Sequence, residues 1–180
     1  MNYVSQCMTP KVSTDHIAKI TVPTGGLNPG SVVVADTLDN TINGNYEVWK
    51  ATQPAASNLD SKFMAIVLND GFETLEDGRR PAGQPNYYKY TFEAGEVAPV
   101  IFLDTHLVFN ISADALDTDT KANADVGKFL YATAGSNALT VGDSIPAGTA
   151  TGLKIVAKHS TPAGGQYGGD FITSYVCVAQ

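Results

Sequence analysis

The chain has 180 residues, of which 43% are hydrophobic and 16% are charged, and its formal net charge is −7. This length and hydrophobic fraction predict a folded protein, because a domain of this size buries about 70% of the surface that its unfolded chain exposes. The acidic balance, with no Lys/Arg cluster beyond Arg79 and Arg80, argues against nucleic acid or an anionic membrane as a partner.

Neither a signal peptide nor a transmembrane segment is predicted. The N-terminus lacks a continuous apolar stretch behind a basic start, and no run approaches 18 apolar residues. We therefore expect a soluble protein made in the cytoplasm. Cys7 and Cys177 lie near opposite ends of the chain and form no C-x-x-C motif. Cys177 is expected to be buried in its apolar run, and whether the two thiols are free stays open.

In chain order, residues 1–15 come first and show little periodicity, so we expect a flexible N-terminal arm. Short β-branched runs then alternate with segments rich in Gly, Pro, Asn and Asp. The runs are KITV, SVVVADTL, YEVWKA, KFMAIVLN, NYYKYTFEA, VAPVIFLDTHLVFNIS, GKFLYATA, ALTV, GLKIVAKHS and DFITSYVCVA. This pattern predicts an all-β fold, a small β-sandwich or β-barrel with short strands and long loops.

Local patterns add detail to this prediction. Asn43 and Gly44 are the best candidates for a tight hairpin turn, and the charged, Gly-rich loop 69–85 is expected to be exposed. Within residues 100–112, alternation puts one apolar set on a single face. That set is Ile101, Leu103, Leu107, Phe109 and Ile111, with Thr105 among them. The other face is half apolar, which suits either a bend between two sheets or a strand partly covered by a neighbour.

Helix is expected to be scarce. The segment that starts at Ser112 has too few apolar residues for more than one or two helical turns, and AASNLDSKFMAI fits a helix or a loop followed by a strand. We expect a β-rich unit over 16–111, an acidic loop or linker over 112–127 and a C-terminal β unit over 128–180. A surface loop within one continuous domain is the alternative for the acidic segment, and both stay open.

No motif identifies a metal site or a cofactor site. The densest carboxylate group is Asp114, Asp117, Asp119 and Asp125. An EF-hand starting at Asp117 would place Lys121 and Lys128 at ligand positions, so we interpret the group as a solvated acidic turn. The Gly-rich segments PTGGLNPG and GGQYGGD lack the features of phosphate-binding loops, so no cofactor is expected.

Catalysis is not predicted either. Asp104 and His106 would share one face of a strand, where a carboxylate can orient an imidazole, but no nucleophile motif accompanies them. We interpret the pair as a surface hydrogen bond, with a small hydrolase as the alternative. Tyr88, Tyr90 and Phe92 also share a face, which indicates core packing or an interface for sugar or protein.

Several runs together resemble a known family. In the N-terminal part these are GGLNPGSVVVADTL, EVWKA, FMAIVLND and EAGEVAPVIF, and in the C-terminal part VGKFLYATAGSNALTV, GLKIVAKHS and DFITSYVCVAQ. The chain resembles the head decoration, or cement, proteins of tailed bacteriophages. In that family a flexible N-terminal arm precedes a Gly-rich turn into a valine-rich strand, and small β-barrel units follow.

The resemblance implies a non-enzymatic protein of the virion that binds assembled major capsid protein on the outer shell, often as a trimer, and stabilises the shell. We expect residues 1–15 to become ordered on a capsid neighbour, with Tyr3, Val4, Met8 and Val12 as apolar anchors. Deletion of this arm should then leave the fold intact. Two alternatives remain: a phage tail or head-fibre component, and a carbohydrate-binding β-sandwich that uses Trp49 and the tyrosines.

Overall fold

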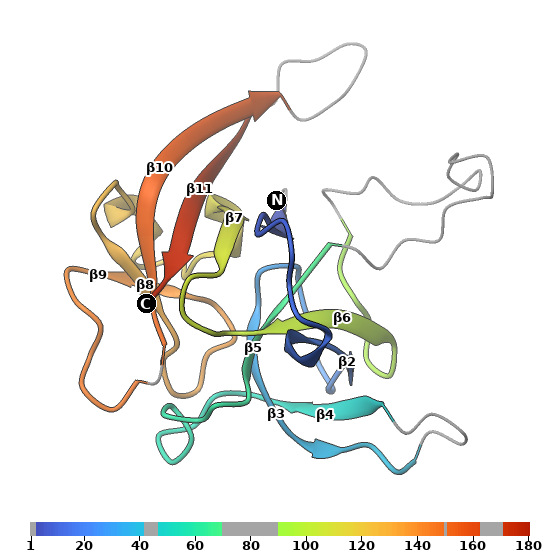
Figure 1. Cartoon of the computed structure of the whole chain (residues 1–180). Coiled ribbons are helices and arrows are strands. Elements are labelled where there is room, and N and C mark those ends of the chain that lie inside the picture. Colours follow the sequence, from blue (N-terminus) through green and yellow to red (C-terminus); the bar gives the residue numbers. More distant parts are fainter. Residues whose placement is uncertain (1–2, 42–46, 70–89, 150, 163–170) are drawn as a thin grey trace.

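The structure, a computed structural model, describes residues 3–41, 47–69, 90–149, 151–162 and 171–180 (Figure 1). Of these residues, 44% lie in strands and 6% in helices, and no helix among them reaches seven residues. The prediction of an all-β fold is therefore confirmed. No helix in the described ranges is long and apolar enough to cross a membrane.

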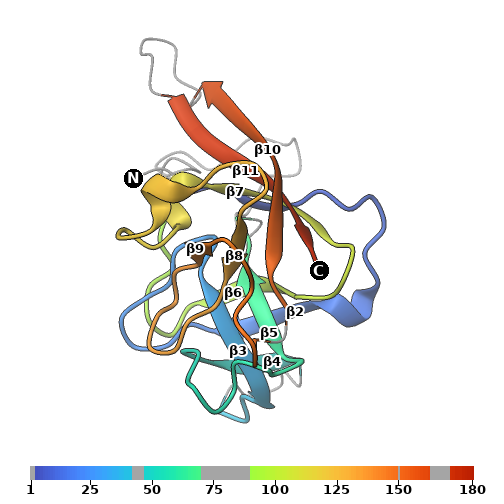
Figure 2. The same ribbon diagram turned by 90° about the vertical axis from the view of Figure 1, so that its left-hand side faces the viewer.

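The strands form two sheets (Figures 1 and 2). A closed five-stranded barrel has the order β2-β4-β3-β5-β6, and a second sheet has the order β1-β7-β11-β10-β8-β9. The barrel strands are β2 (Ile17–Thr21), β3 (Val32–Leu38), β4 (Val48–Thr52), β5 (Met64–Val67) and β6 (Val97–Phe102). The strands of the second sheet are β1 (Ser5–Cys7), β7 (Val108–Ser112), β8 (Phe129–Tyr131), β9 (Thr140–Gly142), β10 (Leu153–Pro162) and β11 (Phe171–Ala179).

The barrel interior is filled largely by small side chains. Every barrel strand contributes one alanine to the inner hydrophobic cluster: Ala18, Ala35, Ala51, Ala65 and Ala98. A barrel with fewer strands has a smaller diameter, and a barrel of eight strands already encloses only enough room for packed side chains. A five-stranded barrel therefore closes only when each strand turns a small side chain inward, and here the valines and Ile20 fill the remaining space.

A second hydrophobic cluster joins the barrel to the other sheet. Its barrel members come from the outer faces of β3, β5 and β6 and the residues that follow them: Val32, Val34, Met64, Ile66, Leu68, Ile101 and Leu103. Opposite them lie Phe109, Ile111, Leu130, Leu153, Ile155 and Cys177 of the second sheet. Because one cluster contains residues of both sheets, the two sheets share a continuous core.

The shared core crosses the expected boundary between the two β units, which favours the alternative of one continuous domain. Strand β7 belongs to the sheet of the C-terminal strands, so the chain leaves the barrel after Phe102 rather than at 112–127. The segment 112–127 contains only two 3-10 helices, η3 (Ala113–Ala115) and η4 (Lys121–Asn123), which confirms the expectation of short helical turns. It contributes Ala115, Leu116 and Ala124 to the core, so it is not a linker.

The alternation in residues 100–112 is confirmed, and it marks a bend between the sheets. All five predicted core residues of this segment belong to the shared core. Strands β6 and β7 lie in different sheets, and His106 turns the corner between them with a φ of 73°. A residue with positive φ does not fit a regular strand, so the chain turns at His106. The apolar residues before the turn belong to the barrel side of the shared core, and those after it belong to the side of the second sheet.

The N-terminal segment is folded onto the chain itself, which corrects the expectation of a flexible arm. Strand β1 pairs antiparallel with β7, with Ser5 opposite Ile111. The Asn69 side chain accepts a hydrogen bond from the Ser5 N–H and donates one to the Tyr3 carbonyl at 3.0 Å. The Ser112 Oγ accepts from the Val4 N–H at 2.9 Å. The partners lie 64 to 108 residues away in sequence, so no local pattern could have revealed them.

Other sequence predictions have different outcomes. The segment AASNLDSKFMAI forms turns followed by strand β5, which confirms the expectation of a loop and a strand and not that of a helix. Phe92 is buried and Tyr90 packs on it edge-to-face at 4.9 Å, which favours core packing for that pair. The Asn43–Gly44 turn, Tyr88 and the loop from residue 70 lie outside the described residues.

We predict that Asn69→Ala destabilises the protein. The change leaves the Ser5 N–H and the Tyr3 carbonyl without these partners in a buried site, at a cost of about 1–3 kcal/mol for each group. The two groups together cost about 2–6 kcal/mol, so for a chain of this size Tm should fall by about 5–20 °C. Thermal unfolding followed by circular dichroism measures the effect, and Asn123→Ala at an exposed position is the control. An unchanged Tm, or an unchanged Tm after deletion of residues 2–8, would show that the segment is not part of the fold.

We also predict that the two cysteines react differently. Both thiols are free, with Cys7 partly exposed in β1 and Cys177 buried. Burial raises the pKa of the Cys177 thiol to about 12, so almost no reactive thiolate forms near neutral pH. A chromogenic disulfide reagent should label Cys7 first and Cys177 only after unfolding. Cys7→Ser should remove the fast phase, and fast labelling that persists in this variant would contradict the burial of Cys177.

Candidate functional site

The four expected capsid-binding anchors do not form one surface. Tyr3 and Val4 are 8% and 7% exposed and belong to the protein's own interior, and Val12 is half-buried against the shared core. Only Met8, at 52%, is well exposed. This corrects the anchor hypothesis, because side chains already packed inside the chain are not free to bind a neighbour.

The predicted contact between Asp104 and His106 is not formed. The Asp104 carboxylate instead meets the Nε2 of His16 at 2.8 Å, and this hydrogen bond holds the pKa of Asp104 below its ordinary value. His106 lies at the bend between β6 and β7 and is exposed. The hydrolase alternative loses its dyad, since the two side chains do not act together.

The acidic turn does not gather into a metal site in the part of the chain that the structure describes. No group of three or more His, Cys, Asp and Glu side chains there could hold a metal ion. Asp117 instead accepts a hydrogen bond from the Thr120 hydroxyl at 3.0 Å, as expected of a solvated turn.

One end of the barrel exposes a group of aromatic and aliphatic side chains. The strand pairings bring the starts of β2, β4 and β5 to the same end as the finishes of β3 and β6. The aromatic side chains at this end are Trp49 of β4, Phe102 of β6 and Phe63, which directly precedes β5. The opposite end is covered, because Leu27 and Phe92 bridge across it.

The three rings pack against one another, and Phe102 meets both of the others at a steep angle, while Trp49 and Phe63 are tilted by 31°. The ring centroids of Trp49 and Phe102 are 6.0 Å apart with an angle of 86° between the ring planes. Phe63 lies 5.9 Å from Trp49 and 6.2 Å from Phe102. Edge-to-face arrangements of this kind stabilise an aromatic cluster beyond its buried area alone. Phe63 is nevertheless 43% exposed, so solvent reaches part of the cluster.

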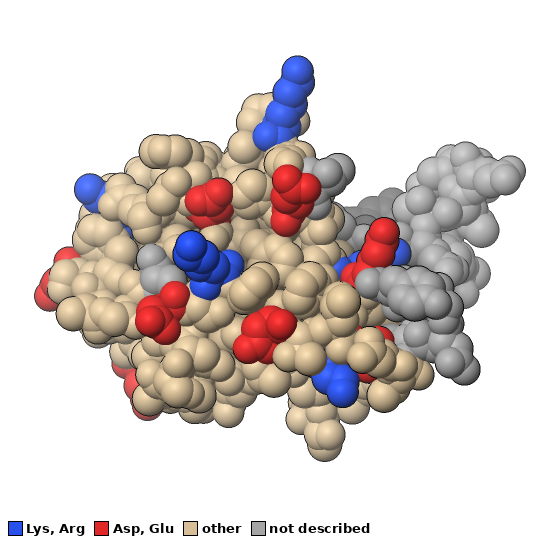
Figure 3. All heavy atoms as spheres, turned by 60° about the horizontal axis from the view of Figure 1, so that its bottom comes forward, with Lys and Arg blue, Asp and Glu red and all other residues tan. Residues whose placement is uncertain are grey.

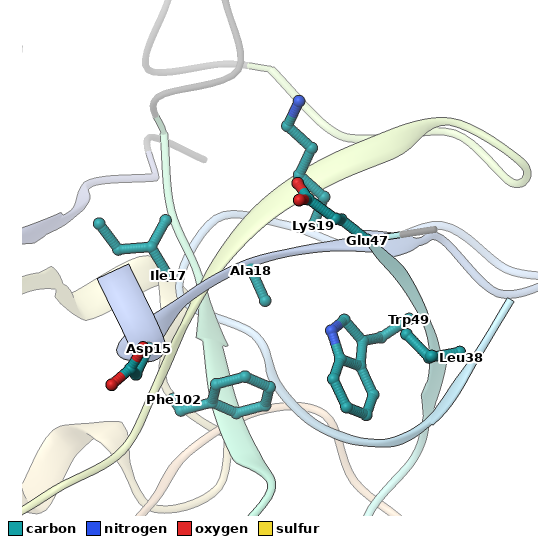
Figure 4. A pocket seen from close by; sticks show the side chains of 8 residues that line it. All are labelled: Asp15, Ile17, Ala18, Lys19, Leu38, Glu47, Trp49 and Phe102. Atoms are coloured by element: carbon teal, nitrogen blue, oxygen red, sulfur yellow. The ribbon is translucent and has the colours of Figure 1, made fainter. Parts of the chain in front are cut away.

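A groove of about 680 Å³ opens beside these rings (Figure 4). We call this groove the barrel mouth, and its lining residues are Asp15, Ile17, Ala18, Lys19, Leu38, Glu47, Trp49 and Phe102. Apolar side chains form the walls, and the three charged side chains stand at the rim. In Figure 4, Lys19 and Glu47 lie at one end of the groove and Asp15 at the other.

A β-bulge in β3 shapes one wall of the barrel mouth. The pairing of β3 with β4 shifts by one residue between Val34 and Thr37, so Leu38 rather than Thr37 stands opposite Trp49. Side chains directly opposite on paired strands share a face, and a shift of one residue exchanges the faces. The bulge therefore places an apolar side chain beside the indole, where the regular register would place a hydroxyl.

Asp39 ties the strands together near this end. Its carboxylate accepts hydrogen bonds from the Thr21 hydroxyl of β2 at 2.6 Å and from the Thr41 hydroxyl at 2.6 Å. Its own N–H donates to the Val48 carbonyl of β4 at 2.7 Å. The hydrogen bonds from Thr21 and Thr41 lower the pKa of Asp39 to about 2. The pairing of β2 with β4, which is parallel and short, is thus held by a side chain as well as by the backbone.

The β10–β11 hairpin is a second candidate surface. The two strands pair along nine positions, but β8 pairs only with Leu153 and Lys154, and β7 only with residues 174–178. Residues 156–162 and 171–173, which we call the projecting hairpin, therefore run past neighbouring strands: 156–159 lie beyond the end of β8, and 160–162 and 171–173 lie beyond both β7 and β8 (Figures 1 and 2). Its apolar side chains Val156 and Phe171 are 46% and 64% exposed.

Comparison of the chain with protein-family models, curated proteins and solved structures finds no match in any of the three. The barrel mouth and the projecting hairpin are therefore the structural basis for a proposed function.

Sequence reasoning identified only part of the candidate site. It named Trp49 as a binding residue of the carbohydrate alternative, and this residue does line the barrel mouth. It missed Phe63, Phe102 and Leu38, because their grouping depends on barrel closure and on the bulge. The available signal was weak: Phe63 and Leu38 lie at or near an end of a β-branched run, and Phe102 lies inside one.

We predict that Asp39 makes stability depend on pH in the acidic range. Its pKa in the folded state, about 2, lies below its ordinary value of 3.8. The stabilisation is therefore present above about pH 4 and is lost as the pH falls through about 2. The Tm difference between the natural chain and Asp39→Asn should be largest above pH 4 and should shrink towards pH 2. Asp60→Asn at an exposed position is the control, and a difference independent of pH would contradict this role.

Proposed function

We propose that the chain is a non-enzymatic structural protein of a phage virion that binds the outer surface of assembled capsids and stabilises the shell. The proposal includes the major capsid protein as the partner and a homotrimer as the bound form. The resemblance described above motivates it. The observation that carries it in the structure is the projecting hairpin, which exposes Val156 beyond the end of β8 and Phe171 beyond both neighbouring strands.

The projecting hairpin suits attachment for physical reasons. A β-ribbon that extends beyond the body can reach a neighbouring subunit without rearrangement of the core. Exposed large apolar side chains such as Phe171 are common anchors in protein interfaces. Lys158, whose ammonium lies 5.8 Å from the Tyr175 ring centroid, adds a positive charge to this part of an acidic chain.

The sparse surface charge also supports a protein partner that is not strongly charged. Figure 3 shows Lys, Arg, Asp and Glu side chains scattered over a largely uncharged face. With few charges to steer association, affinity must come from apolar and backbone contacts, and many weak contacts on a symmetric shell act together. A tail or head-fibre component would use the same hairpin. Capsid decoration and a tail or fibre role therefore differ in the assembly that the chain binds.

The test is co-sedimentation with purified heads and, separately, with purified tails of the phage that encodes the chain. We expect binding to assembled heads but not to tails. The double variant Val156→Ser and Phe171→Ser should weaken head binding by at least about tenfold, because it removes both apolar anchors, without a change in Tm. Val97→Ser removes a valine of similar exposure, 42% against 46% for Val156, from barrel strand β6 and is the matched control.

Two results would contradict the proposal. Binding to tails alone would assign the chain to the tail or fibre. Head binding that is unchanged in the double variant would show that the projecting hairpin is not the attachment surface.

A further inference from the structure

We infer that the barrel mouth is a carbohydrate-binding site that takes a pyranose unit of a neutral oligosaccharide. This site is separate from the projecting hairpin and does not depend on capsid binding. Its volume of about 680 Å³ lies within the range of small-molecule sites, about 300–1,000 Å³. Mouths of β-barrels are also among the usual places for such sites.

The walls of the barrel mouth match the apolar face of a sugar ring. A pyranose presents C–H groups on its faces, and the face of an aromatic ring carries the negative part of its quadrupole, which attracts them. Trp49 and Phe102 are both half-buried and stand at 86° to each other, so they form a corner with a base and a side wall. Ala18 lies between the two rings in Figure 4, and its small side chain leaves the corner open.

The rim supplies the polar groups that sugar hydroxyls require. Each hydroxyl both donates and accepts hydrogen bonds, so it pairs best with a rim that carries acceptors and donors together. Asp15 and Glu47 provide carboxylate acceptors, and Lys19 provides an ammonium donor. The Trp49 indole N–H is a further donor, and it makes no hydrogen bond to any residue that the structure describes.

Other classes of ligand fit this chemistry less well. An extended peptide binds best along a free strand edge, but β2 and β4 are paired on both sides within a closed barrel. A strongly charged ligand would meet charges of both signs on the rim. A purely apolar ligand would leave the charged rim groups partly desolvated without partners. A neutral ligand with an apolar face and hydroxyls at its edge satisfies the walls and the rim at once.

The experiment uses the full chain and its intrinsic fluorescence. Trp49 is the single tryptophan of the protein, so its emission reports directly on the barrel mouth. A glycan array selects candidates among neutral gluco-, manno-, galacto- and chito-oligosaccharides, and these are then titrated up to about 10 mM. We expect at least one to change the emission saturably, with the same affinity by calorimetry.

Variants separate recognition at the rim from folding. The double variant Asp15→Ala and Glu47→Ala changes exposed side chains only, and it should weaken the selected oligosaccharide by about tenfold or more with an unchanged Tm. The matched control, Asp60→Ala with Asp119→Ala, should bind as the natural chain does. Trp49→Phe keeps a ring but removes the N–H, so it should retain weaker binding by calorimetry.

The inference is overturned if no neutral oligosaccharide binds on the array or changes the emission. It is also overturned if the rim variant binds as tightly as the control, or if only peptides or charged ligands bind at the barrel mouth. The hairpin double variant Val156→Ser and Phe171→Ser should bind the oligosaccharide normally. Failure of this inference and failure of the capsid proposal are therefore separable.

Discussion

Strand β5 and the first four residues of β3 are buried on both faces, and this double burial joins the two sheets into one molecule. The inner residues Val33, Ala35, Ala65 and Val67 are fully buried in the barrel, and the outer residues Val32, Val34, Met64 and Ile66 are buried against the second sheet. At about 25 cal/mol per Å² of apolar area removed from water, such strands are where burial stabilises the fold most. The continuous runs VVVA and MAIV follow from this, since these eight positions have no face left for polar side chains, whereas Asp36 and Thr37 follow in the exposed half of β3.

The positions of the two candidate surfaces follow from the same arrangement. The second sheet covers one side of the barrel, and the Leu27–Phe92 bridge covers one end, so the barrel mouth is the end that stays accessible. The projecting hairpin belongs to the other sheet, beyond the point where β7 and β8 stop pairing. A ligand at the mouth and a large partner at the hairpin would therefore contact different sheets, and the two proposed activities can be altered one at a time.

The N-terminal strand changes how attachment must be understood. Three of the buried polar residues, Ser5, Asn69 and Ser112, lie where β1 meets the rest of the chain. Buried polar groups usually have hydrogen-bond partners. The Val4 and Ser5 N–H groups, the Asn69 amide and the Ser112 hydroxyl have such partners here, whereas the Ser5 hydroxyl has none among the described residues. Release of this strand to bind a neighbour would expose Tyr3 and Val4 and break these hydrogen bonds. Attachment through surfaces that are already exposed carries no such cost.

The class of the fold, the apolar face of residues 100–112 and the shortness of the helices could be predicted from the sequence, because they depend on side-chain alternation and turn residues within a few positions of one another. Three features emerge only in the folded chain: β1 pairs with β7, five strands close into a barrel, and Leu38 instead of Thr37 stands opposite Trp49. These features depend on pairing between segments far apart in the chain and on a bulge of one residue. Alternation predicts which residues share a face, but it does not predict which strand lies beside which or in what register, and the barrel mouth exists only once both are set.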